Sequence, residues 1–150
     1  MKIFLIVFIF LIFLSIGVWI YCKYYYRHQL FKDLCYVCSH LKNNITFRKD
    51  KISIILNESY SNISSNSKKL FLNISKSSNF IFKNEDIELV RKFMNSLGKG
   101  DVDYEINNLN YYENNFNELR VNYHELLKKN GTMYIKLMIG IGLAVCVILI

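Results

Sequence analysis

The sequence of 150 residues contains no proline, only six glycines and four cysteines. Because proline breaks or kinks helices, its absence is compatible with long uninterrupted helices. The length argues against a large multidomain enzyme, and the uneven distribution of apolar residues argues against a disulfide-stapled mini-protein. Apolar residues crowd the two ends, whereas the middle is polar, basic and rich in Asn, Ser and Lys. This distribution predicts a small polar domain held by a membrane at both ends.

The sequence also lacks the short motifs of common enzyme classes, including G-x-x-x-x-G-K, H-E-x-x-H and G-x-S-x-G. Cys35 and Cys38 have the spacing of a redox or metal pair, but only His28 and His40 lie nearby, without a second recognised ligand pair. We expect no enzyme activity, no catalytic residues, no cofactor and no metal site. A redox or zinc role for the two cysteines is the alternative. Because the basic residues are spread out, we expect no nucleic-acid partner.

Each end of the chain carries a long apolar run. Ile3 to Ile20 has no charged residue and would span roughly 27 Å as a helix, close to a hydrocarbon core of about 30 Å. Bulky residues follow it instead of the small residues of a cleavage site, so residues 3–21 predict a membrane helix rather than a signal peptide. Residues 133–150 predict a second span, interrupted only by Lys136, which can reach the headgroups.

Small residues lie along one side of the second run. Gly140 and Ala144 form a small-xxx-small pair, with Gly142 beside them. Such spacing lets helices approach closely in lipid, so these three residues are candidates for helix packing. Glycine is also common in membrane helices generally, and that simpler explanation stays open.

Basic residues follow the first run and precede the second: Lys23, Arg27, Lys32, Lys128 and Lys129. The positive-inside rule therefore predicts that residues 22–130 form a cytoplasmic domain, with both termini at the far face of the membrane. The excess of positive charge in the middle suits membrane lipids with anionic headgroups as partners.

The middle has helical periodicity. Apolar residues recur at three- and four-residue steps from Leu30 to Ile45, which predicts an amphipathic helix continuous with the first span. Asp50 is a candidate cap for a short helix through Leu56, and residues 57–80 are expected to hold a short helix, with a strand as the alternative. Asn84 is a candidate cap for the next helix. Its apolar stripe is Ile87, Val90, Phe93, Met94 and Leu97.

The segment Leu97 to Asp101 reads as a helix stop, a turn and a new cap, with Gly98 or Gly100 free to take positive φ. The following helix, about Val102 to Asn130, has apolar residues in a heptad pattern. They are Leu109, Tyr112, Phe116, Leu119, Tyr123 and Leu126. This seam either fills the protein's own core or serves a partner, including a second copy. The predicted fold is all-α: an antiparallel helical hairpin or bundle flanked by two transmembrane helices.

With this layout, the chain resembles the stage III sporulation protein AB family. The motif F-x-x-x-L-G-x-x-D, here Phe93 to Asp101, and the segment from Tyr123 to Gly131 leading into Gly140 and Gly142 carry the resemblance. Leu30 to Ser59 aligns with the family's first cytoplasmic helix and following turn. Asp50-Lys51-Ile52 replaces the T-P-L of the family at that turn.

The resemblance implies a non-enzymatic membrane component of the sporulation channel that joins mother cell and engulfed forespore. Its soluble part would be all-helical, similar to cytoplasmic domains of type II secretion platform proteins. It would work with other sporulation-complex proteins, including a secretion-type ATPase. The residues expected to form the partner contact are Phe93, Leu97, Gly98, Gly100 and Asp101. The alternative is a membrane-tethered coiled-coil protein that oligomerises through the heptad seam.

Overall fold

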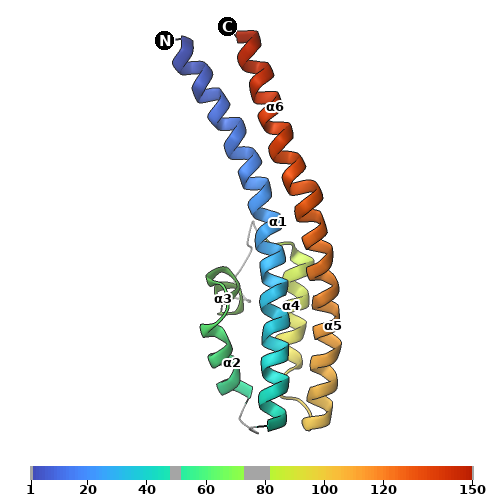
Figure 1. Cartoon of the computed structure of the whole chain (residues 1–150). Helices are drawn as coiled ribbons and strands as arrows, with labels where there is room; N and C mark the ends of the chain where they lie inside the picture. The colour runs from blue at the N-terminus through green and yellow to red at the C-terminus, as the bar shows by residue number, and fades with distance from the viewer. Residues whose placement is uncertain (1, 48–51, 73–81, 150) are drawn as a thin grey trace. The chain divides into compact units, whose positions relative to one another are not determined.

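The computed structural model describes residues 2–47, 52–72 and 82–149, and all regular elements in these ranges are helices. They are α1 (Lys2–Phe47), α2 (Ile52–Ser61), α3 (Ser65–Leu72), α4 (Asn84–Ser96), α5 (Val102–Leu126), the π-helical turn η1 (Leu127–Gly131) and α6 (Thr132–Leu149) (Figure 1). The prediction of an all-α protein is confirmed. The chain divides into two units: an apolar unit, Met1–Tyr25 with Asn122–Ile150, and a polar unit, Tyr26–Val121.

In the apolar unit, the first part of α1 packs against α6, and glycines lie at the contact. A Cβ added at Gly17 would be 3.3 Å from the Cβ of Met138, and one added at Gly142 would be 2.9 Å from Cδ2 of Phe10. The later residue of α1 thus meets the earlier residue of α6, so the two segments are antiparallel. The absence of a side chain at both glycines lets the helices approach closely.

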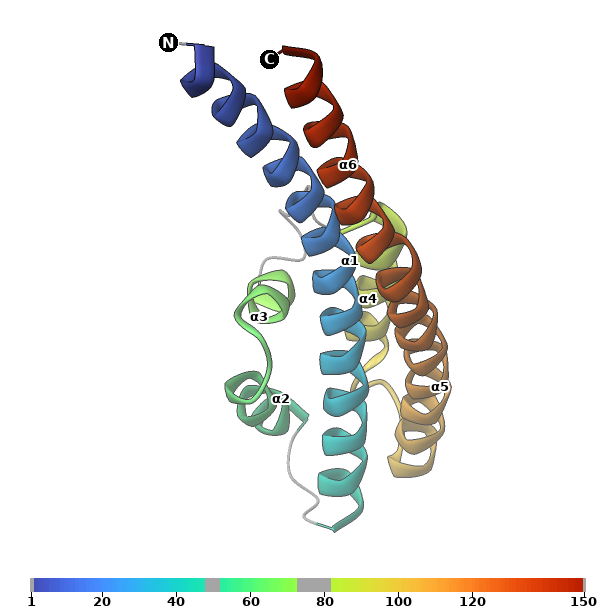
Figure 2. The same ribbon diagram turned by 45° about the horizontal axis from the view of Figure 1, so that its top comes forward.

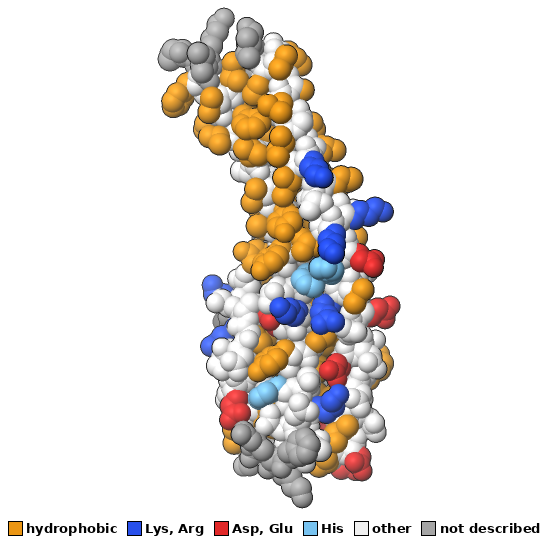
Figure 3. Space-filling view, in the orientation of Figure 1, with side chains coloured by type: hydrophobic (Ala, Val, Ile, Leu, Met, Phe, Trp, Pro, Cys, Tyr) orange, Lys and Arg blue, Asp and Glu red, His pale blue; other side chains and the backbone are white. Residues whose placement is uncertain are grey.

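Large apolar side chains cover the outside of the apolar unit. Phe4 is 83% exposed and Val147 is 73% exposed. Figure 3 shows hydrophobic side chains gathered over the start of α1 and over α6. By length and composition, two helices of the described chain could cross a membrane, and only 6% and 11% of their most apolar stretches are buried. Most of the surface of these stretches is therefore not covered by other described parts of the chain.

In the polar unit, the second part of α1 lies between α2 and α3 on one side and α4 and α5 on the other (Figures 1 and 2). The apolar face predicted for this segment is confirmed, since all its members are buried: Leu30, Phe31, Leu34, Val37, Cys38, Leu41 and Ile45. Because helices cover it from two sides, this segment is the centre of the core.

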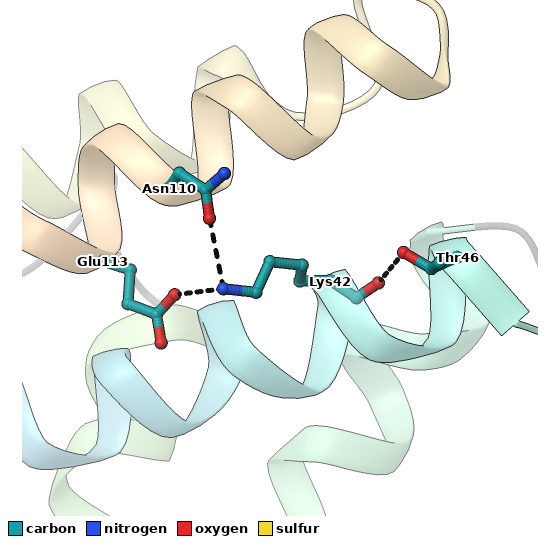
Figure 4. A network of polar contacts seen from close by, with 4 residues as sticks. All are labelled: Lys42, Thr46, Asn110 and Glu113. Carbon is teal, nitrogen blue, oxygen red and sulfur yellow. Dashed lines mark hydrogen bonds and ion pairs between the residues drawn. The ribbon is translucent and has the colours of Figure 1, made fainter.

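Within the polar unit, α1 and α5 run in opposite directions. The rings of Phe31 and Phe116 lie 6.1 Å apart. Further along α1, the ammonium of Lys42 donates to Oδ1 of Asn110 at 3.1 Å and forms an ion pair with Glu113 at 2.8 Å (Figure 4). A later residue of α1 thus meets earlier residues of α5. The aromatic pair supplies apolar burial, and the polar contacts fix the register.

The apolar stripe of α4 completes the core. Ile87, Val90 and Phe93 are buried, and Met94 is partly buried. The ring of Phe93 meets that of Phe116 edge to face at 5.3 Å. The predicted stripe therefore faces α5.

Polar side chains anchor the two short helices to α1. Nδ1 of His40 lies 2.9 Å from Oγ of Ser59 in α2, and Ser59 donates to the carbonyl of Ile55. Asp33 accepts hydrogen bonds from the backbone N–H and the hydroxyl of Ser64, immediately before α3. Isolated helices this short are unstable in water, so these bonds help to hold them in place.

Two details of the sequence prediction are wrong. Asn84 is the first residue of α4 rather than its cap, because the backbone of Lys83 is extended and its N–H bonds to Asp86 at 3.3 Å. The helix predicted to run to Asn130 changes at Leu127 into the π-helical turn η1. The proposed cap at Asp50 lies outside the described residues.

Candidate functional site: the turn between α4 and α5

Three residues determine the conformation of the turn between α4 and α5. Leu97 has extended backbone, with φ −71° and ψ 140°, and ends α4. Gly98 has φ 75°, a left-handed conformation that glycine adopts without steric cost. Asp101 then accepts a hydrogen bond from the N–H of Tyr104 at 2.9 Å and caps α5. The predicted stop, turn and cap are confirmed.

Glu105 fixes this turn from inside. Its side chain is folded back so that Oε1 accepts hydrogen bonds from the N–H groups of Lys99, at 2.9 Å, and Gly100, at 3.2 Å. Glu105 is only 3% exposed. Sequence reasoning missed this residue. An acidic residue in the first turn of a helix indicates compensation of the helix dipole and gives no sign of burial.

The second oxygen of this carboxylate has no hydrogen-bond partner among the described residues. Oε2 of Glu105 is buried, and no group in the described ranges of the chain forms a hydrogen bond with it. A buried polar atom without a hydrogen bond costs about 1–3 kcal/mol, and more when it is charged. Such an atom is unusual enough in a folded protein to require an explanation.

The outer side of the turn is open. Residues 98–104 are exposed, with Val102 and Tyr104 exposed by 50% and 51%. The ring of Tyr104 lies directly against Gly100, where a Cβ would collide with it. Asp101 and Asp103 add two exposed carboxylates. The site therefore combines an apolar and aromatic surface with negative charge.

The residues predicted for partner contact fall into two groups. Phe93 is fully buried and packs against aromatic rings of α5, and Leu97 is partly buried. Gly98, Gly100 and Asp101 lie on the exposed side of the turn. Only the last three are therefore accessible from outside, while Phe93 belongs to the core.

The three small residues singled out in α6 do not share one environment. Gly142 is buried against Phe10. Gly140 and Ala144 are exposed, and no described atom lies within 4 Å of a Cβ added at Gly140. Of the three, Gly142 is thus the residue used for packing within this chain.

The two cysteines of the C-x-x-C pair lie on α1 away from the turn. Cys38 is fully buried, and burial raises the pKa of its thiol and that of the partly buried Cys35. His40 is bonded to Ser59, and His28 lies 3.2 Å from the carbonyl of Arg120. Within the described ranges, no three His, Cys, Asp or Glu side chains are grouped so as to hold a metal ion. Raised thiol pKa values are the opposite of what a reactive cysteine requires.

The fold and the site define an all-helical protein in which two long apolar helices accompany a polar helical unit. Residues 74–150 match the model of the family stage III sporulation protein AB, and the chain belongs to this family. The match includes α4, α5 and α6, and therefore the turn described above. The family resemblance seen in the sequence is confirmed, and the protein is related to sporulation. No curated protein and no solved structure matches the chain.

Proposed function

We propose that this protein is a non-enzymatic scaffold in the mother-cell membrane. It is a component of the channel to the forespore, where it docks a secretion-type ATPase to the membrane. Membership of the sporulation family supports the setting. The observation that carries the docking role is the exposed turn of residues 98–101, which Glu105 holds in one conformation from inside. A fixed exposed surface is suited to recognition, because little conformational entropy is lost on binding.

In the proposed topology, the apolar stretches of α1 and α6 cross the membrane. The exposed apolar surface of both helices is suited to lipid. Lys23 and Arg27 follow the first stretch, and Lys128 and Lys129 precede the second. By the positive-inside rule, the polar unit then lies in the cytoplasm.

A single exposed cysteine tests this topology. Asn117 is exposed on α5, so Asn117→Cys gives a thiol on the surface of the polar unit. A maleimide that cannot cross membranes should label this variant in permeabilised cells and not in intact cells. The wild-type chain, with its four native cysteines, is the control for background. Labelling of the introduced thiol in intact cells would contradict a cytoplasmic polar unit.

The docking role is tested by the double variant Gly98→Leu, Asp101→Ala. Leucine is strained at the positive φ of residue 98, and alanine removes the cap of α5. We expect normal membrane levels, at least tenfold weaker binding of the purified secretion-type ATPase, and reduced spore formation. Glu118→Gln, an exposed change on the same helix, should leave all three unchanged. Stable insertion with normal sporulation would refute this contact.

The alternative of a tethered coiled-coil protein depends on a free heptad seam. Leu109 and Phe116 of this seam are fully buried in the chain's own polar unit, so they are not available to another molecule. Sedimentation of the full chain in detergent distinguishes the two proposals. A monomer is incompatible with oligomerisation through the seam.

A further inference from the structure

We infer that Oε2 of Glu105 receives an arginine side chain of the docked partner, which makes this carboxylate the anchor of the docking surface. This inference rests on the proposed function and identifies the chemistry that the turn recognises. Its starting point is the unpartnered oxygen of a side chain that is only 3% exposed. The same carboxylate is held in place by two backbone N–H groups of the turn through Oε1.

Oε2 is suited to a hydrogen-bond donor rather than to a metal ion. Calcium takes six to eight oxygen ligands, and magnesium is usually bound through one or two carboxylates together with several waters. The described residues include no cluster of three His, Cys, Asp or Glu that could hold an ion. A single N–H group completes the hydrogen bonding of Oε2, and a charged donor also compensates the negative charge of a buried carboxylate.

The surface around Glu105 favours arginine over lysine. Tyr104 is 51% exposed and borders the turn, so a planar guanidinium can stack on its ring while donating to the carboxylate. Exposed Asp101 and Asp103 add negative charge along the approach, and Lys99 is the one lysine among residues 98–104. Val102, which is 50% exposed, offers an apolar contact for the stem of the arginine.

Because Oε2 is buried, an entering side chain must displace neighbouring groups of the turn. The ring of Tyr104 lies against Gly100, and the N–H of Gly100 is bonded to the other oxygen of the same carboxylate. Because Tyr104 is half exposed, rotation of its ring away from Gly100 would remove few packing contacts. A guanidinium entering beside Gly100 could then stack on the displaced ring.

The test compares two isosteric changes in the full chain reconstituted in lipid nanodiscs. Glu105→Gln retains an oxygen for the N–H groups of Lys99 and Gly100, but presents an NH₂ donor in place of the free oxygen. Glu118→Gln makes the same change of charge at an exposed position of α5. Binding of the purified secretion-type ATPase is measured by biolayer interferometry, and the melting temperature of each variant is recorded.

We expect the dissociation constant to rise at least tenfold for Glu105→Gln and less than twofold for Glu118→Gln. The melting temperature of Glu105→Gln should stay within a few degrees of that of the wild type, since the amide oxygen still accepts from the N–H groups of Lys99 and Gly100. Tyr104→Ala, a change at a half-exposed position outside the core, should weaken binding about threefold by removing the stacking surface.

Failure of this inference can be distinguished from failure of the proposed function. Wild-type affinity of Glu105→Gln would overturn the inference and leave the docking role intact. Absence of ATPase binding by the wild type would refute the proposed function itself, and the inference with it.

Discussion

Cys38 shows how burial sets the chemistry of a single residue in this protein. Its side chain lies on the central face of α1 with no exposed surface. Burial raises the pKa of the thiol because a thiolate would lose its hydration, and the charge of Glu113 acts in the same direction. The thiol therefore behaves as a small apolar side chain of the core.

This burial predicts a loss of stability at alkaline pH. Below the ordinary thiol pKa of 9.0, both folded and unfolded chains carry a neutral Cys38. At higher pH the unfolded chain loses the proton while the folded chain keeps it, so the unfolded state is favoured. The free energy of unfolding should fall by up to about 1.4 kcal/mol for each pH unit above that value.

The measurement is urea unfolding of the full chain in detergent micelles between about pH 8 and pH 10.5. Cys38→Val keeps a small apolar side chain, and its stability should fall less steeply with pH. Some dependence remains in this variant, since burial also raises the pKa values of Cys35 and Tyr60. Identical slopes for the two proteins would show that Cys38 ionises in the folded chain.

At the scale of helices, α6 offers a matched pair of glycines two residues apart. Gly142 is buried, and a Cβ there would be 2.9 Å from Cδ2 of Phe10 on α1. Gly140 faces outward, with no described atom within 4 Å of an added Cβ. The two positions separate the packing role of glycine from its effect on helix propensity, because both lie inside one helix.

Gly142→Leu should separate α6 from α1, whereas Gly140→Leu should not. The reporter is a disulfide between Ile6→Cys and the native Cys146, since Sγ of Cys146 lies 4.0 Å from the carbonyl oxygen of Ile6. We expect the yield of this crosslink to fall several-fold in Gly142→Leu and to stay near the parent value in Gly140→Leu. Equal yields would mean that Gly142 is not needed for close approach.

Helix α5 is held to its neighbours by one aromatic residue in particular. Phe116 is fully buried and contacts the rings of Phe31 and Phe93. Phe116→Ala should therefore lower the free energy of unfolding by about 3–5 kcal/mol, through lost burial and the cavity left behind. Tyr111→Ala, at a residue 63% exposed on the same helix, should change it by less than about 0.5 kcal/mol. Urea unfolding of both variants checks the difference.

At the scale of the whole molecule, the proposed topology places the exposed surface of the apolar unit in lipid. Leu143 is 54% exposed near the middle of the second apolar stretch. A lysine near the centre of a membrane helix costs about 2.5–3.5 kcal/mol on the insertion scale. Leu143→Lys should therefore reduce insertion of α6, because the charge would face lipid.

Labelling of Cys146 by a water-soluble maleimide, mapped by mass spectrometry, measures this effect. In wild-type membranes Cys146 should react slowly, and in Leu143→Lys several times faster. Asn117→Lys, at an exposed position of the polar unit, adds the same charge and should leave the labelling unchanged. Equal labelling in all three proteins would argue against insertion of α6.

Periodicity made most of the helical architecture predictable. The sequence predicted the apolar face from Leu30 to Ile45, the stripe of α4 and the turn at Gly98. Three- and four-residue spacing, glycine and a capping aspartate each act locally along the chain, so these features could be predicted without knowledge of the packing. The cap of α4 was misplaced at Asn84 because Lys83, which has no acceptor in its side chain, is held instead by the carboxylate of Asp86.

The sequence by itself determined the helical class, the two apolar ends, the turn and the family, since all of these depend on residue type and spacing along the chain. The tertiary structure decided which glycine of α6 faces Phe10, and that Phe93 lies in the core rather than on the exposed side of the turn. It also decided that Glu105 is buried with one oxygen unpartnered. Burial and contact between distant residues depend on how helices pack, and no local pattern in the sequence specifies that packing.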